Sequence, residues 1–142
     1  MKTNTIELGR AIKQLQYLNH RRLEIAFREI GTTLAQWDAL RSIHENPDVS
    51  AHALAEDTFQ TDQSFGTLAI RLIAKGLIER KQGAGRALTH SLTSKGQLIL
   101  AQAMVIAGDV VDDSFKYLSE SERAILLPLV QKVLLHNKVG KG

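Results

Sequence analysis

The 142 residues are long enough to bury a core as one domain, and 44% of them are hydrophobic, as is ordinary for a globular protein. The chain has no cysteine, which excludes disulfides, thiolate metal sites, cysteine nucleophiles and thiol-oxidation switches. The net charge is +3, and we expect a cytoplasmic protein because we find neither the apolar segment of a secretory signal nor the roughly 18 apolar residues of a membrane span.

Helical spacing and capping residues mark the first two predicted helices. Apolar residues recur every three to five positions, which predicts one amphipathic helix over about residues 5–30. Gly31 follows where a C-cap glycine belongs. Thr33 and Gln36 have the spacing of a capping box, and the helix that they open ends at 46–48. Its apolar face consists of Leu34, Trp37, Leu40 and Ile43.

Two shorter helices are expected next. Val49 is expected in a short strand, and Ser50 is placed to cap a helix over about residues 51–57. Thr61 is a second N-cap, and its helix is predicted to run to Lys75. The inward residues of this helix are expected to be Phe65, Leu68, Ala69, Leu72 and Ile73.

The hydrophobic period changes after this helix. Residues 77–81 and 88–92 have strand character and are joined by a glycine-rich turn, which predicts a β-hairpin. A long helix is expected over about 94–116, and a capping box at 119–122 opens a last helix that Pro128 should kink. The expected apolar contacts are Leu98, Ala101, Val105 and Val110 in the first of these helices, and Leu126, Leu129, Val130, Val133 and Leu134 in the second.

Four helices, a hairpin and two further helices predict a mainly α fold with a winged helix-turn-helix. A two-stranded hairpin is marginal by itself, so this one must pack on the helices. The first and last helices are too apolar to be covered by a small central module, which predicts a homodimer. We expect a DNA-binding lobe over residues 34–96 and a dimerisation lobe formed by 1–33 and 97–142.

The positive charge of the chain is concentrated in two stretches. Residues 1–30 hold 6 Lys/Arg against 3 Asp/Glu, and residues 61–96 hold 6 against 2. In a winged helix-turn-helix, one helix enters the major groove with its N-terminal residues at the base edges, and the wing can place a cation in the minor groove. The residues expected to contact duplex DNA are Ser50, Thr61, Gln63, Ser64, Thr67, Arg71 and Arg86.

Each of these residue types suits a particular contact. Gln63 can bond an adenine with both amide atoms, Arg71 can bind a phosphate or a guanine, and the hydroxyl residues can reach phosphates or thymine methyl groups. Asp62 can accept from a cytosine, although capping of the helix dipole is the favoured role. Arg86 follows the hairpin turn and suits the minor groove. A merely solvated polar face is the alternative for the whole set.

Two segments resemble the multiple-antibiotic-resistance-regulator (MarR) family. Residues 68–80, Leu-Ala-Ile-Arg-Leu-Ile-Ala-Lys-Gly-Leu-Ile-Glu-Arg, look like its recognition helix and first wing strand. Residues 86–96 resemble its second wing strand and the Leu-Thr-x-x-Gly start of the next helix, and residues 53–55 match the helix before the turn. The resemblance implies a dimeric repressor or activator on a pseudo-palindromic operator, and we expect a repressor.

The resemblance also implies a ligand. Many members of the family release DNA when a small, often aromatic, anion binds between the dimer helices and the DNA-binding lobe. The corresponding pocket would be lined by Tyr17, His20, Arg21, Trp37 and His44, although ordinary packing and surface charge explain these residues better. Two departures from the family pattern are Ala84, where the wing has an aspartate, and Phe59, where the turn often has a glycine. They predict a looser wing tip and a differently shaped turn.

An enzyme is the first rival interpretation. The sequence shows no nucleophile motif, phosphate loop or paired-carboxylate site, and we expect its five histidines to lack acidic neighbours at metal-ligand spacing. We therefore expect no catalytic activity, no cofactor and no metal. The second rival is a winged-helix module that binds protein or RNA without effector control, and little affinity for duplex DNA at low salt would favour it.

Overall fold

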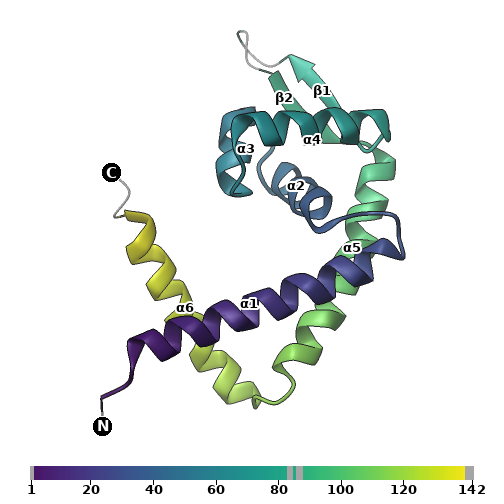
Figure 1. Cartoon of the computed structure of the whole chain (residues 1–142). Helices are drawn as coiled ribbons and strands as arrows, with labels where there is room; N and C mark the ends of the chain where they lie inside the picture. The colour runs from purple at the N-terminus through teal and green to yellow at the C-terminus, as the bar shows by residue number, and fades with distance from the viewer. Residues whose placement is uncertain (1, 83–84, 86–87, 140–142) are drawn as a thin grey trace.

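The computed structural model describes residues 2–82, 85 and 88–139. Its elements are α1 (Thr5–Arg28), α2 (Leu34–Glu45), α3 (Ala51–Asp57), α4 (Asp62–Ala74), β1 (Ile78–Gln82), β2 (Leu88–Leu92), α5 (Ser94–Phe115) and α6 (Glu120–Val139). Figure 1 shows α2, α3, α4 and the hairpin gathered in one lobe, with the long helices α1 and α5 extending away from it. The order confirms the predicted winged helix-turn-helix.

The turn between α1 and α2 is only partly as predicted. Gly31 has a φ of +71°, as its place after the helix requires. The Thr33 hydroxyl accepts from the Gln36 amide at 3.1 Å, which is half of a capping box. The other half is absent from the described contacts, because the Gln36 side chain is buried and accepts from Lys75 Nζ at 3.0 Å. The prediction of a complete box was therefore wrong.

The winged lobe has a continuous core built from α2, α3, α4, the hairpin and the start of α5. Its buried residues are Ala39, Leu40, Ile43, Leu54, Ala55, Phe65, Leu68, Ala69, Leu72, Leu77, Ile78 and Leu100. Four of the five inward positions predicted for α4 are confirmed. The prediction that Ile73 faces inward is wrong, because Ile73 lies about 100° around the helix from Leu72 and is 36% exposed.

The sheet is smaller than predicted. Within the described residues it contains β1 and β2 alone, paired antiparallel with Ile78 opposite Leu92 and Arg80 opposite His90. Val49 is not in a strand, so that prediction was wrong. It lies between α2 and α3, after Asp48 with a φ of +70°, and packs half-buried against the core. Val49 is thus partly buried without being paired in a strand.

The junction of the hairpin and α5 explains the Leu-Thr-x-x-Gly motif. Thr93 caps α5 by accepting from the Gly96 amide at 3.0 Å, and its hydroxyl donates to the Gly76 carbonyl at 2.6 Å. Its own amide donates to the Leu77 carbonyl at 3.0 Å. Gly96 passes so close that a Cβ there would lie 1.9 Å from the Leu77 carbonyl oxygen. The motif therefore ties the end of α4 to the start of α5.

A second cluster joins α1 to α5. It is formed by Leu23, Phe27, Ala103 and Ala107, with the half-buried Trp37 in contact with both clusters. The face predicted for α5 was wrong in this single chain, since Leu98, Ala101 and Val105 are exposed. Val110 alone of the four packs against the second cluster.

Helix α6 begins at a complete capping box. The Ser119 hydroxyl accepts from the Glu122 amide at 3.1 Å, and the Glu122 carboxylate accepts from the Ser119 amide at 2.9 Å. The helix then continues through Pro128. Figure 1 shows that α5 and α6 form an open V. The large apolar side chains of α6 are exposed to solvent in the single chain. None of the described helices has the length and apolar character that crossing a membrane requires.

Candidate nucleic-acid interface

The start of α4 is fixed by Thr61. This residue is extended, and its hydroxyl accepts from the Ser64 amide at 3.0 Å, so the helix begins with its N-terminus at the surface of the lobe. An open concavity of about 480 Å³ lies along this face of α4. It is lined by Ala35, Gln60, Thr61, Gln63, Ser64, Thr67, Leu68 and Arg71. Five of the seven predicted DNA-contact residues therefore share one surface.

The side chains on this surface differ in whether they are already bonded. The Ser64 hydroxyl donates to Gln60 Oε1 at 3.1 Å, and the Thr67 hydroxyl donates to the Gln63 carbonyl at 3.1 Å. The side-chain amide of Gln63 and the guanidinium of Arg71 make no hydrogen bond to the rest of the described chain. Because residues 63, 67 and 71 are four apart, these two free groups lie on the same side of α4. They are the groups best placed to bind a ligand.

The two remaining predicted contact residues lie elsewhere. Ser50 caps α3, with its hydroxyl accepting from the Ala53 amide at 3.1 Å, and it does not line the concavity. Arg86 lies outside the described residues, as does Ala84, so their places in the wing stay predictions. Within the described part of the hairpin, Arg80 and Lys81 of β1 are exposed.

The turn between α3 and α4 holds Phe59 in a backbone conformation that a glycine would favour, which does not support the differently shaped turn predicted from this residue. This residue has a φ of +57°, a left-handed conformation that favours glycine, and its side chain is 91% exposed. The amides of Phe59 and Gln60 donate to the Glu56 and Ala55 carbonyls at 3.2 and 2.8 Å. The turn is thus closed by backbone hydrogen bonds despite the side chain at its left-handed position.

His52 has acidic neighbours that sequence reasoning missed. Its Nδ1 lies 2.8 Å from Asp62 Oδ1, and its Nε2 lies 3.0 Å from Glu56 Oε1. The prediction that the histidines lack such neighbours was therefore wrong. Glu56 is four residues along the same helix, a spacing that signals the contact. The Asp62 contact crosses the turn and has no such signal. The described residues contain no group of three side chains suited to a metal ion.

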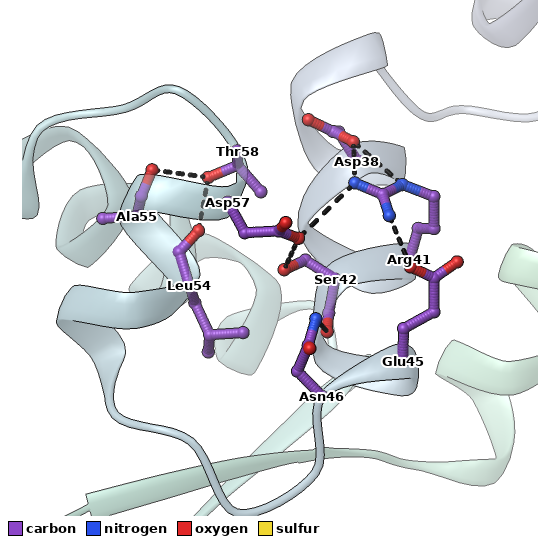
Figure 2. Close-up of polar contacts among 9 residues, drawn as sticks. All are labelled: Asp38, Arg41, Ser42, Glu45, Asn46, Leu54, Ala55, Asp57 and Thr58. Carbon is purple, nitrogen blue, oxygen red and sulfur yellow. Dashed lines mark hydrogen bonds and ion pairs between the residues drawn. The ribbon is translucent and has the colours of Figure 1, made fainter. Parts of the chain in front are cut away.

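An ion-pair network holds α3 against α2 (Figure 2). Arg41 contacts Asp38 at 2.8 Å, Glu45 at 2.6 Å and Asp57 at 3.7 Å, and the Ser42 hydroxyl donates to Asp57 Oδ2 at 2.6 Å. Burial by itself lowers the pKa of Arg41, but the three carboxylates outweigh it and raise the pKa. Arg41 is therefore a structural cation with its donors already engaged.

The predicted effector residues do not converge in the single chain. Tyr17, His20 and Arg21 are exposed on α1. Trp37 packs on Phe27, with ring centroids 5.5 Å apart, and its buried Nε1 has no partner in the described part of the chain. A crevice of about 400 Å³ between α2 and α5 is lined by Arg41, His44, Glu45, Gln97, Leu100, Ala101 and Met104. Of the five predicted residues it contains His44 alone.

Sequence relatives agree with this fold. A family model described as the MarR family matches residues 30–87. The transcriptional regulator HosA of Escherichia coli O127:H6 is 31% identical over 105 residues, which cover 72% of this chain and 77% of HosA. The HTH-type transcriptional repressor Rv2887 of Mycobacterium tuberculosis is 31% identical over 88 residues, or 59% of this chain and 63% of that protein.

Solved structures agree as well. A mutant MarR from Escherichia coli, crystallised with operator DNA, superposes with a TM-score of 0.80 and 27% identity over 92% of this chain and 95% of that one. Rv2887 crystallised with p-aminosalicylic acid gives a TM-score of 0.76 and 21% identity, covering 89% of this chain and 97% of that one, which supports the fold. The two sequence relatives are named as a transcriptional regulator and a transcriptional repressor. This chain belongs to the MarR family of transcriptional regulators.

Proposed function

We propose that the protein is a cytoplasmic, homodimeric repressor that binds a specific duplex through α4 and the hairpin. The observation that carries the proposal is the pair of unbonded side chains, Gln63 and Arg71, on the open face of α4. The fold is the one in which the MarR of Escherichia coli was crystallised with operator DNA. A helix presented in this way fits the major groove, with its first turns at the base edges.

The residues of the α4 face divide into two kinds of contact. Gln63 lies in the first turn, where a side chain reaches base edges, and its amide can both donate to and accept from adenine. Arg71 lies two turns further and suits a phosphate or a guanine. The Thr61 hydroxyl is committed to the helix as acceptor but can still donate to a phosphate, and the helix N-terminus favours an anion there.

Dimerisation is supported by the uncovered apolar faces of α1 and α6. The described part of α6 has no buried residue, and its large apolar side chains are 37–63% exposed. Those exposed on α6 are Ile125, Leu126, Leu127, Leu129, Val130, Val133, Leu134 and Leu135, and those on the first half of α1 include Ile6, Leu8, Ile12 and Leu15. An apolar surface of this extent is typical of a protein–protein interface, and a second copy of the chain supplies a matching one.

A small aromatic or anionic effector is part of the proposal. The crevice beside His44 offers an apolar floor of Leu100, Ala101 and Met104 under polar side chains, and a partner subunit would close its open side. Rv2887 has been crystallised with salicylic acid and with p-aminosalicylic acid, so these compounds are the first to test. The proposal still includes Tyr17 and Arg21 of α1 as residues that line the effector site in the dimer.

A salt titration tests the proposed function. The protein is titrated with duplexes enriched from a random-sequence pool, and the affinity is measured as salt rises. Binding through 6–10 phosphates should weaken by roughly 10³–10⁵-fold between about 50 and 200 mM salt. A winged-helix module for protein or RNA would show little duplex affinity even at low salt, and that result would overturn the proposal.

A further inference from the structure

His52 connects the two helices of the helix-turn-helix. It lies on α3, and its two ring nitrogens contact carboxylates on opposite sides of the turn, Glu56 of α3 and Asp62 of α4. The two contacts are 3.0 and 2.8 Å long. All three side chains are largely exposed to solvent, so they share the surface of the lobe that carries the start of α4.

The geometry of these contacts favours the charged form of the imidazole. A neutral imidazole has one N–H, whereas an ionised carboxylate can only accept hydrogen bonds. A hydrogen bond to Asp62 through one nitrogen and an ion-pair contact to Glu56 through the other favour an imidazole that is protonated on both nitrogens. The hydrogen bond to Asp62 and the negative charges of Asp62 and Glu56 accordingly raise the pKa of His52 above its usual value.

Other charged groups near α3 are directed elsewhere. On the α2 side, Asp57 is engaged by Arg41 and Ser42. On the β2 side, His90 is buried against Phe65. Lys138 of α6 lines the crevice that contains Glu56 and Asp57, but it is not among the groups that shift the pKa of His52. The charge of His52 is therefore set mainly by Asp62 and Glu56.

The position of Asp62 gives this contact a consequence for DNA. Asp62 is the first residue of α4 and lies between Thr61 and Gln63, which both line the proposed DNA-binding surface. A free carboxylate there would repel phosphates. We propose that His52, in its charged form, is a positioning residue for DNA recognition, which holds Asp62 against α3 and neutralises it, so that loss of the His52 proton weakens duplex binding.

This inference rests on the proposed function and has a definite sign. Below the pKa of His52 the trio carries one net negative charge, and above it carries two. Duplex affinity should therefore fall as the pH rises through that pKa. A unit charge about 8 Å from a phosphate in water changes affinity about 2.4-fold, so a dimer with two half-sites should lose about sixfold.

The test is a pH profile of duplex affinity at constant ionic strength, with NMR titration of the histidine rings. The wild type should lose affinity over the pH range in which His52 titrates. His52→Gln should bind weakly with little change over that range, and Asp62→Asn should bind well at every pH and bring the pKa of His52 back toward its ordinary value. His136→Gln, on the exposed surface of α6, is the matched control and should keep the wild-type profile.

Each other outcome is decisive. Wild-type affinity that does not change while His52 titrates contradicts the inference, as does a His52→Gln variant that keeps the full pH dependence. An unshifted His52 pKa in the NMR titration contradicts the double contact itself. Absence of duplex binding at every pH contradicts the proposed function as well, whereas binding that is independent of His52 contradicts the inference alone.

Discussion

Gly96 shows how one residue links α4 and the hairpin to the rest of the molecule. A Cβ at this position would meet the Leu77 carbonyl oxygen at 1.9 Å, and both groups belong to backbone that cannot move separately from α5 and the hairpin. We expect Gly96→Ala to lower the free energy of unfolding by about 2 kcal/mol or more, since overpacking outweighs the gain in helix propensity. Denaturant unfolding at fixed protein concentration measures this change.

The control for Gly96 lies on the same helix. A Cβ at Gly108 has no neighbour within 4 Å, so Gly108→Ala should stabilise the protein by up to about 1 kcal/mol. Equal effects of the two substitutions would contradict the close approach at Gly96.

Phe59 is a position where the sequence departs from what the backbone favours. Its left-handed conformation costs about 1–2 kcal/mol for a residue with a Cβ, and its side chain is too exposed to offset this by packing. Part of the gain from a glycine is lost to the flexibility of the unfolded chain, so Phe59→Gly should raise the free energy of unfolding by up to about 1 kcal/mol. Phe59→Ala keeps the Cβ and should give no gain. A glycine variant no more stable than the alanine variant would contradict this account.

His90 makes the stability of the hairpin sensitive to acid. Both ring nitrogens are buried without a partner in the described chain, and the ring packs edge-on to Phe65. Burial, and then the charge of Arg80, lower the pKa of His90. The unfolded chain therefore takes up this proton at a higher pH than the folded chain, and folding stability falls as the pH drops below the ordinary histidine pKa.

The variant His90→Leu isolates this effect. The difference in unfolding free energy between about pH 7.5 and pH 5 should be smaller in His90→Leu than in the wild type. The raised pKa of His52 makes folding stability rise as the pH falls, which is opposite to the effect of His90. The wild type and His90→Leu must therefore both be measured at both pH values. An unchanged difference would show that His90 is not held neutral.

At the scale of elements, the sequence predicted starts of helices better than their buried faces. Thr33, Ser50, Thr61 and Ser119 each accept a hydrogen bond from an amide three residues on, a contact encoded by local spacing. Which residues of α5 are buried depends on the element or subunit that packs against the helix. Leu100, Ala103 and Ala107 face this chain, whereas Leu98 and Val105, which the hydrophobic pattern favoured, are exposed.

The face of α4 that is proposed to bind DNA was also predictable in part. Helical spacing alone placed Ser64, Thr67 and Arg71 on one face, and the structure brings them together with Thr61 and Gln63. The contact between His52 and Asp62 depends on the angle between α3 and α4, and local spacing does not contain that angle. The predicted effector residues depend on the arrangement of α1 against other helices, and in the single chain they remain apart.

At the scale of the whole molecule, the exposed faces of α1 and α6 determine the proposed assembly. Leu129 and Leu134 of α6 are 55% and 52% exposed and belong to neither core cluster, so charges there should leave each subunit folded. We expect Leu129→Glu with Leu134→Glu to convert the dimer into a monomer with the helical content retained, as measured by light scattering and circular dichroism.

The control for assembly is an exposed apolar residue outside these faces. Ile70 of α4 is 63% exposed, and Ile70→Glu should leave the measured mass unchanged. A dimer that persists in the double variant would show that α6 is not the main interface.

The central claim is that two copies of α4 read one duplex, and parallel selection of duplexes by the wild type and Gln63→Ala tests it most directly. The wild type should enrich an inverted repeat whose half-site centres are about 10 base pairs apart, or a multiple of that spacing. Gln63→Ala should relax the preference at one position in each half-site by about 1–3 kcal/mol, while Gln97→Ala on α5 should return the wild-type sequence. Enrichment of no inverted repeat, or of the same sequence by Gln63→Ala, would contradict the claim.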